Sequence, residues 1–281
     1  IRTQQYQGNL HTLITQLSGR DKKEMSPDSA PLAGGIRQSE RALRTAGAKN
    51  KYYLISGSSV GIRSNLSPLY AKLPQPIKDK IIAHVVSSTP TAGALHNVSS
   101  ELEQHILTYF REHVRKAKEA DAIPILIGGL HVLSYWFYIV LGEVYGVKAD
   151  IVSLDMDSDM MNYNLDDCGF WNYGIKQGTM DPEKITVVGI EAPSNESERW
   201  AADQDVTFSE HDLPEGRRYE KVFVPLDTDV YRRIKPQKLK EIATRLSGCN
   251  ILGLHISNLE SEYIFGLRDS ELDFLQGLFP G

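Results

Sequence analysis

Side chains that can bind metals gather at three points where an apolar run of the sequence ends. The runs end in Gly128-Gly129-Leu130-His131, Leu154-Asp155-Met156-Asp157-Ser158-Asp159 and Leu226-Asp227-Thr228-Asp229. In an extended segment every second side chain lies on one face, so five carboxylates are expected to converge near one imidazole. Carboxylates this close repel one another unless cations or protons neutralise them. The pattern therefore predicts a cation site.

The ligand types indicate which metal this site would hold. Oxygen ligands with a single imidazole favour Mn²⁺ or Mg²⁺ over Zn²⁺, whose sites are rich in Cys and His. Two such ions could ionise a bridging water near neutral pH, which is the chemistry of hydrolysis. A single Asp at a strand end is more often a helix cap or a turn former, and a single His after a Gly-Gly turn is more often structural. The joint pattern favours the metal interpretation.

The elements that would position these residues follow a regular order. From Ile36 onward, short apolar runs alternate with longer helical periods, which is typical of βαβ units. Continuous apolar runs such as 123–129 require a sheet covered on both faces. We therefore expect a three-layer α/β/α fold with a central, mainly parallel sheet and with function at its carboxyl edge. A helix is expected from Ser100, and strands over 52–56, 81–86, 123–127, 151–154, 185–190, 222–226 and 251–255.

Composition narrows the organisation and the partners. Residues 1–35 carry little core pattern and predict an N-terminal helical and linker segment, whereas residues 36–281 predict one α/β domain. A formal charge of -5 over 281 residues leaves no basic excess for nucleic acid. No apolar stretch has the length of a membrane span. With two cysteines and no leader pattern, we expect a cytoplasmic protein.

The order and spacing of three motifs resemble those of the arginase, agmatinase and formimidoylglutamase (ureohydrolase) superfamily. The motifs are Gly-Gly-x-His at 128–131, Asp-x-Asp-x-Asp at 155–159 and Asp-x-Asp at 227–229. The resemblance runs from about Ile36 to the end of the chain. It is closest to the formimidoylglutamase-like branch, because residues 61–65 resemble its Gly-x-Arg-x-Asn stretch and residues 252–260 resemble its last-strand motif.

The resemblance implies a manganese-dependent hydrolase. Its substrate would be a small molecule with a linear C–N bond in an amidino or formimino group, and a metal-bridging hydroxide would be the nucleophile. A homo-oligomer is implied as well, because members of the superfamily form trimers or hexamers. Two manganese ions are implied, the first held by His131, Asp155, Asp159 and Asp227 and the second by Asp155, Asp157, Asp227 and Asp229.

Several positions depart from the superfamily pattern. Asp157 stands where the family has a histidine ligand, and it adds negative charge to the second metal site. His255 and Asn258 stand where the family has an Asp and a Glu, so a charge-assisted contact to a cationic substrate is lost. Asn172 lies in the loop where a family His shuttles protons. Asn172 and Asn258 are the candidate substrate-binding residues and His255 and Asp159 the candidate catalytic residues, with a buried, satisfied side chain as the alternative for His255.

Two other functions stay open. The first is a catalytically impaired relative that serves as a binding or assembly protein, which Asn172, Asn258 and a short connection after the last motif favour. The second treats the Asp-x-Asp motifs as phosphatase motifs of the haloacid dehalogenase type, although such motifs usually lie early in a chain. Phe170, Trp171 and Tyr173 could line a pocket, but core packing is favoured for them.

Overall fold

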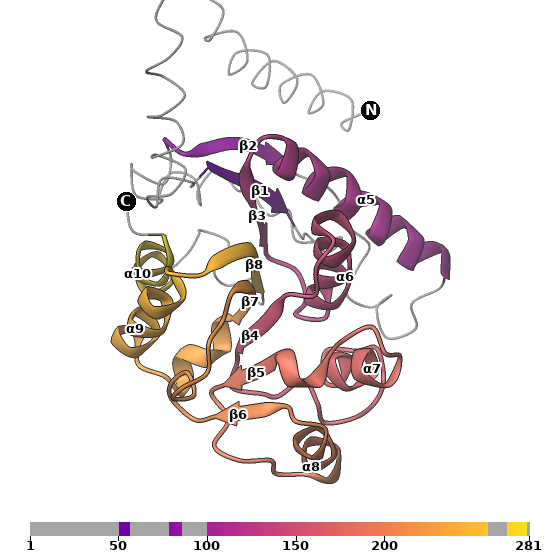
Figure 1. The fold of residues 1–281 in the computed structure, drawn as a ribbon, viewed down its shortest axis with the longest axis vertical. Helices are drawn as coiled ribbons and strands as arrows, with labels where there is room; N and C mark the ends of the chain where they lie inside the picture. The colour runs from indigo at the N-terminus through magenta and orange to yellow at the C-terminus, as the bar shows by residue number, and fades with distance from the viewer. Residues whose placement is uncertain (1–50, 57–78, 86–99, 258–268, 280–281) are drawn as a thin grey trace, which may run out of the picture. The chain divides into compact units, whose positions relative to one another are not determined.

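The computed structural model describes residues 51–56, 79–85, 100–257 and 269–279 of the chain (Figure 1). The chain divides into two units, Ile1–Ala48 and Lys49–Gly281. The first unit lies outside the described residues, and so does the N-terminal segment predicted over residues 1–35. All the described residues belong to the second unit.

A parallel sheet forms the centre of this unit. Its eight strands among the described residues have the order β2-β1-β3-β8-β7-β4-β5-β6, and every neighbouring pair is parallel. The seven predicted strands are confirmed, whereas β6 escapes prediction because three residues are too few to show a periodic pattern. The strands are β1 (Lys51–Ser56), β2 (Ile81–Val85), β3 (Ala122–Ile127), β4 (Asp150–Leu154), β5 (Ile185–Val188), β6 (Thr207–Ser209), β7 (Lys221–Asp227) and β8 (Asn250–Ser257).

Helices cover both faces of the sheet, as predicted for three layers (Figure 1). One core includes buried residues of α5, α6, α7 and α8, and the other includes those of α9 and α10. In the described ranges, no helix has the length and apolar character needed to cross a membrane. The helices are α5 (Ser100–Glu119), α6 (Leu133–Tyr145), α7 (Phe170–Lys176), α8 (Glu196–Asp203), α9 (Pro236–Leu246) and α10 (Asp269–Leu278), with 3-10 turns η2 (Pro182–Lys184) and η3 (Thr228–Arg232).

Strand β1 shows how the sequence pattern produces the two cores. Tyr53 and Ile55 pack into the core beneath α5 and α6, whereas Tyr52 and Leu54 pack into the core beneath α9 and α10. Successive side chains of a strand point to opposite faces, so a strand covered on both faces must be apolar at every position. The continuous apolar runs of the sequence therefore follow directly from the three-layer fold.

The strand order brings three chain segments to one edge of the sheet. Strands β3, β8, β7 and β4 are consecutive neighbours, and all run in the same direction. In register, Leu126 of β3 pairs with His255 of β8, and Asp227 of β7 pairs with Ser257 of β8. The segments that follow β3, β4 and β7 thus leave the sheet at the same carboxyl edge, where parallel α/β proteins bind ligands.

Candidate metal centre

His131 lies in the short turn that follows β3. Gly128 and Gly129 have φ angles of 79° and 84°, which glycine adopts without the steric cost that other residues meet. The turn brings the His131 side chain under cover, where it is only 1% exposed. Its ring packs against Phe170, with 5.5 Å between ring centroids. His131 is therefore held on the edge of the sheet by the turn and by the aromatic core.

Three carboxylates surround the His131 ring. Nε2 of His131 lies 3.7 Å from Oδ2 of Asp155 and 3.4 Å from Oδ2 of Asp159. Nδ1 of His131 lies 3.7 Å from Oδ2 of Asp227. In His131, Asp155 and Asp227, the atoms able to bind a metal all lie within 4.8 Å of one another. The ends of β3, β4 and β7 converge here, as their motifs predicted.

Two of these aspartates are oriented by the same local turn. Oδ1 of Asp155 accepts a hydrogen bond from the backbone N–H of Asp157 at 3.0 Å, and Oδ1 of Asp227 accepts one from the backbone N–H of Asp229 at 2.8 Å. Aspartate often bonds the backbone two residues ahead in this way. In both turns the other oxygen, Oδ2, is the one that faces His131.

The protonation states show what the cluster lacks. Burial lowers the pKa of His131 to about 3, so its ring is neutral. Burial, followed by the charge of Asp227, raises the pKa of Asp155 well above its usual range. Burial, followed by the charge of Asp155, does the same for the pKa of Asp159. Without a cation, these carboxylates would have to take up protons.

A divalent cation fits this donor set. Nε2 of His131 and Oδ2 of Asp159 are buried, and neither has a hydrogen-bond partner among the described residues. Buried polar atoms are rarely left in this state. One ion in contact with both atoms would satisfy them, and a neutral imidazole with carboxylates suits Mn²⁺ or Mg²⁺.

The predicted extended geometry of residues 155–159 is wrong. Strand β4 ends at Leu154, and Asp159 has a φ angle of 51°, so the segment turns instead of alternating. Asp155 and Asp159 are buried as a result, whereas Asp157 is exposed. The structure therefore does not bring Asp157 into the buried cluster, and its predicted role as a ligand of a second ion stays a prediction.

Asp229 also lies apart from the buried cluster. It belongs to η3, and its Oδ1 lies 3.3 Å from Nη2 of Arg232, with 37% of the Asp229 side chain exposed. The chain then passes from η3 almost directly to α9 at Pro236, so the short connection expected from the sequence is confirmed. Four of the six predicted ligands therefore lie together: His131, Asp155, Asp159 and Asp227.

His255 has the features of the buried, satisfied alternative. Its Nε2 lies 3.2 Å from the carbonyl oxygen of Gly128, which can only accept, so Nε2 carries the proton. Its Nδ1 then accepts from the Ser134 hydroxyl at 2.7 Å. Burial, followed by the proximity of His131, lowers the pKa of His255 to about 3. Both ring nitrogens are engaged inside the protein, which leaves none for a substrate.

Of the two predicted substrate-binding residues, the structure describes only Asn172. Asn172 is fully buried, and its Nδ2 donates to the carbonyl oxygens of Met160 at 2.9 Å and Ser197 at 3.2 Å. It therefore joins α7 to the segment that follows β4 and to the first turn of α8. Asn258 lies outside the described residues. Core packing is confirmed for Phe170 and Trp171, which are both 0% exposed, and the half-buried Tyr173 packs against the same core.

Three residues near the cluster are not among the predicted site residues. Ser257 is hydrogen-bonded to Nδ1 of His131, and Ser158 is hydrogen-bonded to the buried Glu198. The sequence signal for Glu198 is a capping box, since Asn195 caps α8 and Glu198 stands three residues later. No comparable signal distinguishes Ser158 or Ser257 from an ordinary serine.

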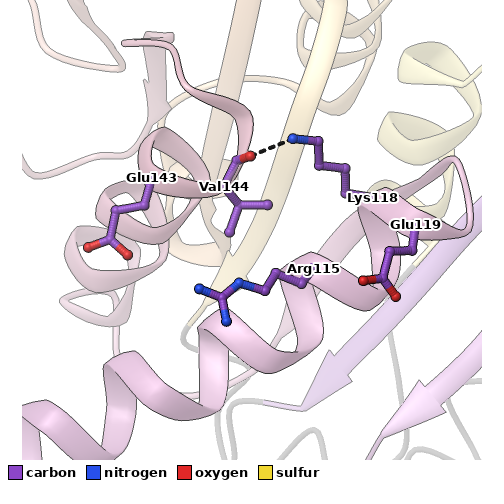
Figure 2. Close-up of a pocket in the computed structure, with 5 residues that line it drawn as sticks. All are labelled: Arg115, Lys118, Glu119, Glu143 and Val144. Carbon is purple, nitrogen blue, oxygen red and sulfur yellow. Dashed lines mark hydrogen bonds between the residues drawn. The ribbon is translucent and has the colours of Figure 1, made fainter.

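A surface pocket of about 510 Å³ lies between α5 and α6, lined by Arg115, Lys118, Glu119, Glu143 and Val144 (Figure 2). The C-terminal ends of these helices lead into the amino ends of β3 and β4, so the pocket lies toward the opposite edge of the sheet from His131. Lys118 donates to the carbonyl oxygen of Val144 at 2.6 Å, and Glu143 pairs with Arg111 at 2.6 Å. We assign no chemistry to this pocket.

Comparisons with known proteins identify a family and several solved structures with a similar fold. A family model described as the Arginase family matches residues 69–233. The fold is similar to formimidoylglutamase from Bacillus subtilis subsp. subtilis str. 168, with a TM-score of 0.57 and 11% identity over 95% of this chain and 99% of that one. It is also similar to arginase from Bacillus cereus, with a TM-score of 0.61 and 12% identity over 83% and 99% of the two chains. For proclavaminate amidino hydrolase from Streptomyces clavuligerus the TM-score is 0.54 and the identity 16%, over 82% and 92%. No match was found among curated protein sequences.

Proposed function

Because this chain belongs to the Arginase family, whose model matches more than half of it, we propose that it is a manganese-dependent hydrolase of a linear C–N bond. The observation that carries the proposal is the buried cluster of one neutral imidazole and three carboxylates at the carboxyl edge of the sheet. The relatives named above support a C–N bond, since their names include an arginase and an amidino hydrolase. We propose an amidino or formimino group of a small molecule as the substrate.

The proposed roles follow from the contacts of each residue. His131, Asp155, Asp159 and Asp227 would hold the first ion, and Asp157 and Asp229 would complete a second. When bound, manganese would supply a Lewis acid that makes a water molecule nucleophilic near neutral pH. Asp159 is the proposed catalytic group because its buried Oδ2 faces His131, where it would help to hold the ion that makes the water nucleophilic. His255 supports the edge of the sheet through Ser134 and Gly128.

Two asparagines, Asn172 and Asn258, are the candidates for contact with the substrate. The amide of Asn172 binds the backbone of Met160 and Ser197, which favours a structural role over direct contact with the substrate. Asn258 lies outside the described residues, and it is the proposed substrate-binding residue because it comes next in the sequence after β8. Homo-oligomerisation and a cytoplasmic location are part of the same proposal.

Metal stoichiometry tests the proposal first. We would dialyse the wild type, Asp155→Ala and Asp227→Ala against Mn²⁺, remove free metal and measure manganese by elemental analysis. Asp203→Ala is the matched control, because Asp203 is an exposed carboxylate at the end of α8. We expect manganese in the wild type and the control and its loss in both other variants. A wild type without manganese contradicts the proposal and favours the binding or assembly role.

Activity is the second test of the proposal. The manganese-loaded wild type would be assayed for hydrolysis of formiminoglutamate, arginine and agmatine, with Asp159→Ala as the inactive control. Hydrolysis that depends on manganese and on Asp159 supports the proposal. Bound manganese without turnover of any C–N substrate would instead indicate a catalytically impaired relative.

A further inference from the structure

The turn that carries Asp159 adopts a conformation that must be held in place. Its φ angle of 51° lies in the left-handed region, which costs a non-glycine residue about 1 kcal/mol or more. The side chain is also buried beside other acidic groups, which adds repulsion. Surrounding contacts therefore have to stabilise this turn if Oδ2 of Asp159 is to face His131.

Ser158 provides the first of these contacts. Its hydroxyl donates to Oε1 of Glu198 at 2.5 Å and accepts from the backbone N–H of Met160 at 3.2 Å. The residues on both sides of Asp159 are thus joined through one serine. Ser158 is 1% exposed and Glu198 is 4% exposed, so water does not compete for these bonds.

Glu198 is itself firmly anchored on α8. Its Oε2 accepts from the N–H and the hydroxyl of Ser194 and from the N–H of Asn195, at 2.5, 2.7 and 3.3 Å. Although burial raises the pKa of Glu198, the hydrogen bonds from Ser158 and Ser194 lower it overall, so the acceptor is an ionised carboxylate. Hydrogen bonds to an ionised acceptor are stronger than neutral ones. The carboxylate therefore links the start of α8 to the Asp159 turn.

Asn172 holds the other side of the same turn. Its Nδ2 donates to the carbonyl oxygen of Met160 and to that of Ser197, which is the neighbour of Glu198. The Asp159 turn is thus connected to α7 and to the first turn of α8 by buried polar groups. These groups act on Asp159 only through its neighbours.

We infer that Glu198 is a positioning residue, which holds Asp159 through Ser158 so that the buried cluster binds a divalent cation tightly. The inference rests on the proposed function, because it assumes that Asp159 is a metal ligand. Groups that orient a ligand from behind typically change metal affinity about 10- to 100-fold when they are removed. Glu198 would therefore govern the affinity without touching the ion.

Calorimetric titration with MnCl₂ alone tests this role, using the metal-free full chain. Ser158→Ala removes the link between Glu198 and the turn. Ser194→Ala is the matched control, because it removes one hydrogen bond to Oε2 of the same carboxylate but leaves both backbone bonds to Oε2 and the Ser158 bond to Oε1 in place. We expect Ser158→Ala to weaken the Kd for Mn²⁺ about tenfold and Ser194→Ala to change it less than about twofold. We expect thermal unfolding without metal to show similar losses of stability in Ser158→Ala and Ser194→Ala, so that a difference in Kd reflects metal binding and not folding.

The outcomes separate this inference from the proposed function. A wild type that binds no Mn²⁺ overturns both. A wild type that binds Mn²⁺, together with a Ser158→Ala variant that binds equally well, overturns only the positioning role. If Ser158→Ala does not fold, Glu198→Gln replaces it, since the amide keeps the shape but cannot accept at both ends. An unchanged Kd in Glu198→Gln would likewise overturn the positioning role, and a Kd raised severalfold would support it.

Discussion

The hydroxyl oxygen of Ser257 lies 2.5 Å from Nδ1 of His131, and this contact joins the end of β8 to the turn after β3. The Ser257 hydroxyl also donates to the carbonyl oxygen of Leu226 at 3.4 Å, so it can accept the proton of Nδ1. This arrangement leaves Nε2 without a proton, facing Asp155 and Asp159. A neutral His presents its second nitrogen to a metal when its first nitrogen is fixed in this way.

Removing the Ser257 hydroxyl should therefore weaken metal binding. We expect Ser257→Ala to raise the Kd for Mn²⁺ about tenfold, measured by calorimetry, because His131 loses the bond that fixes its ring. Ser153→Ala is the control, since Ser153 is a buried serine of β4 whose hydroxyl has no hydrogen-bond partner among the described residues. Equal affinities in the two variants would show that Ser257 does not orient His131.

The different environments of Asp159 and Asp157 predict different effects on the first ion. Asp159→Asn should lower Mn²⁺ affinity at least about tenfold, because a buried ligand with an unpartnered oxygen loses its charge. Asp157→Asn should change the affinity of that ion less than about twofold, because the Asp157 side chain is exposed. Titration of both variants with Mn²⁺ checks this. A similar loss in Asp157→Asn would mean that Asp157 turns inward when metal binds.

The neutral ring of His255 predicts a pH dependence of stability. Burial lowers its pKa from the ordinary histidine value of 6.5 to about 3 in the folded protein, so below pH 6.5 the unfolded chain takes up a proton that the folded chain refuses. The wild type therefore loses stability as the pH falls, by up to about 1.4 kcal/mol per pH unit from this group. The His255→Gln variant should not show this loss of stability, because glutamine takes up no proton in this pH range.

Urea unfolding of the wild type and His255→Gln at pH 7, 6, 5 and 4 measures the effect. The stability advantage of the wild type should shrink steadily toward pH 4. The other titrating groups are common to both proteins, so their contributions largely cancel in the difference. A constant difference across this range would show that His255 titrates normally in the folded state.

A glycine next to the buried cluster should tolerate no side chain. Gly189 has a φ angle of 120°, and a Cβ there would lie 1.8 Å from the backbone oxygen of Asp155. Gly189→Ala should therefore lower the free energy of unfolding by about 3 kcal/mol or more and displace Asp155. Gly178→Ala is the control, because its φ of 69° adds strain but its Cβ would meet nothing within 4 Å. We expect a loss of about 1 kcal/mol there, measured by urea unfolding.

The sequence was sufficient to predict the sheet, because burial on both faces makes each central strand apolar throughout. It was also sufficient to predict that His131, Asp155, Asp159 and Asp227 come together, since parallel strands end at one edge. The strand β6 could not be predicted from three residues. These successes depend on hydrophobic pattern and strand direction, which are properties of the sequence itself.

The details of the cluster depend on contacts that sequence spacing does not show. The side chains stop alternating between the two faces after Leu154, because β4 ends there and the chain turns. Asp159 then adopts a positive φ angle, and Asp157 is exposed. The contact of Ser158 with Glu198 spans 40 positions, so no local pattern reveals it. Contacts of this kind form only after the fold has brought the two segments together.

The place of β8 in the sheet has a consequence for the protein while it is being made. β8 comes last of the described strands in the chain, yet it lies between β3 and β7, which carry the His131 turn and Asp227. A nascent chain that ends before Asn250 already contains all four clustered ligands, but it lacks the strand that holds the two halves of the sheet together. Residues 250–257 must therefore leave the ribosome before the sheet can close, so the proposed metal site can form only late in synthesis.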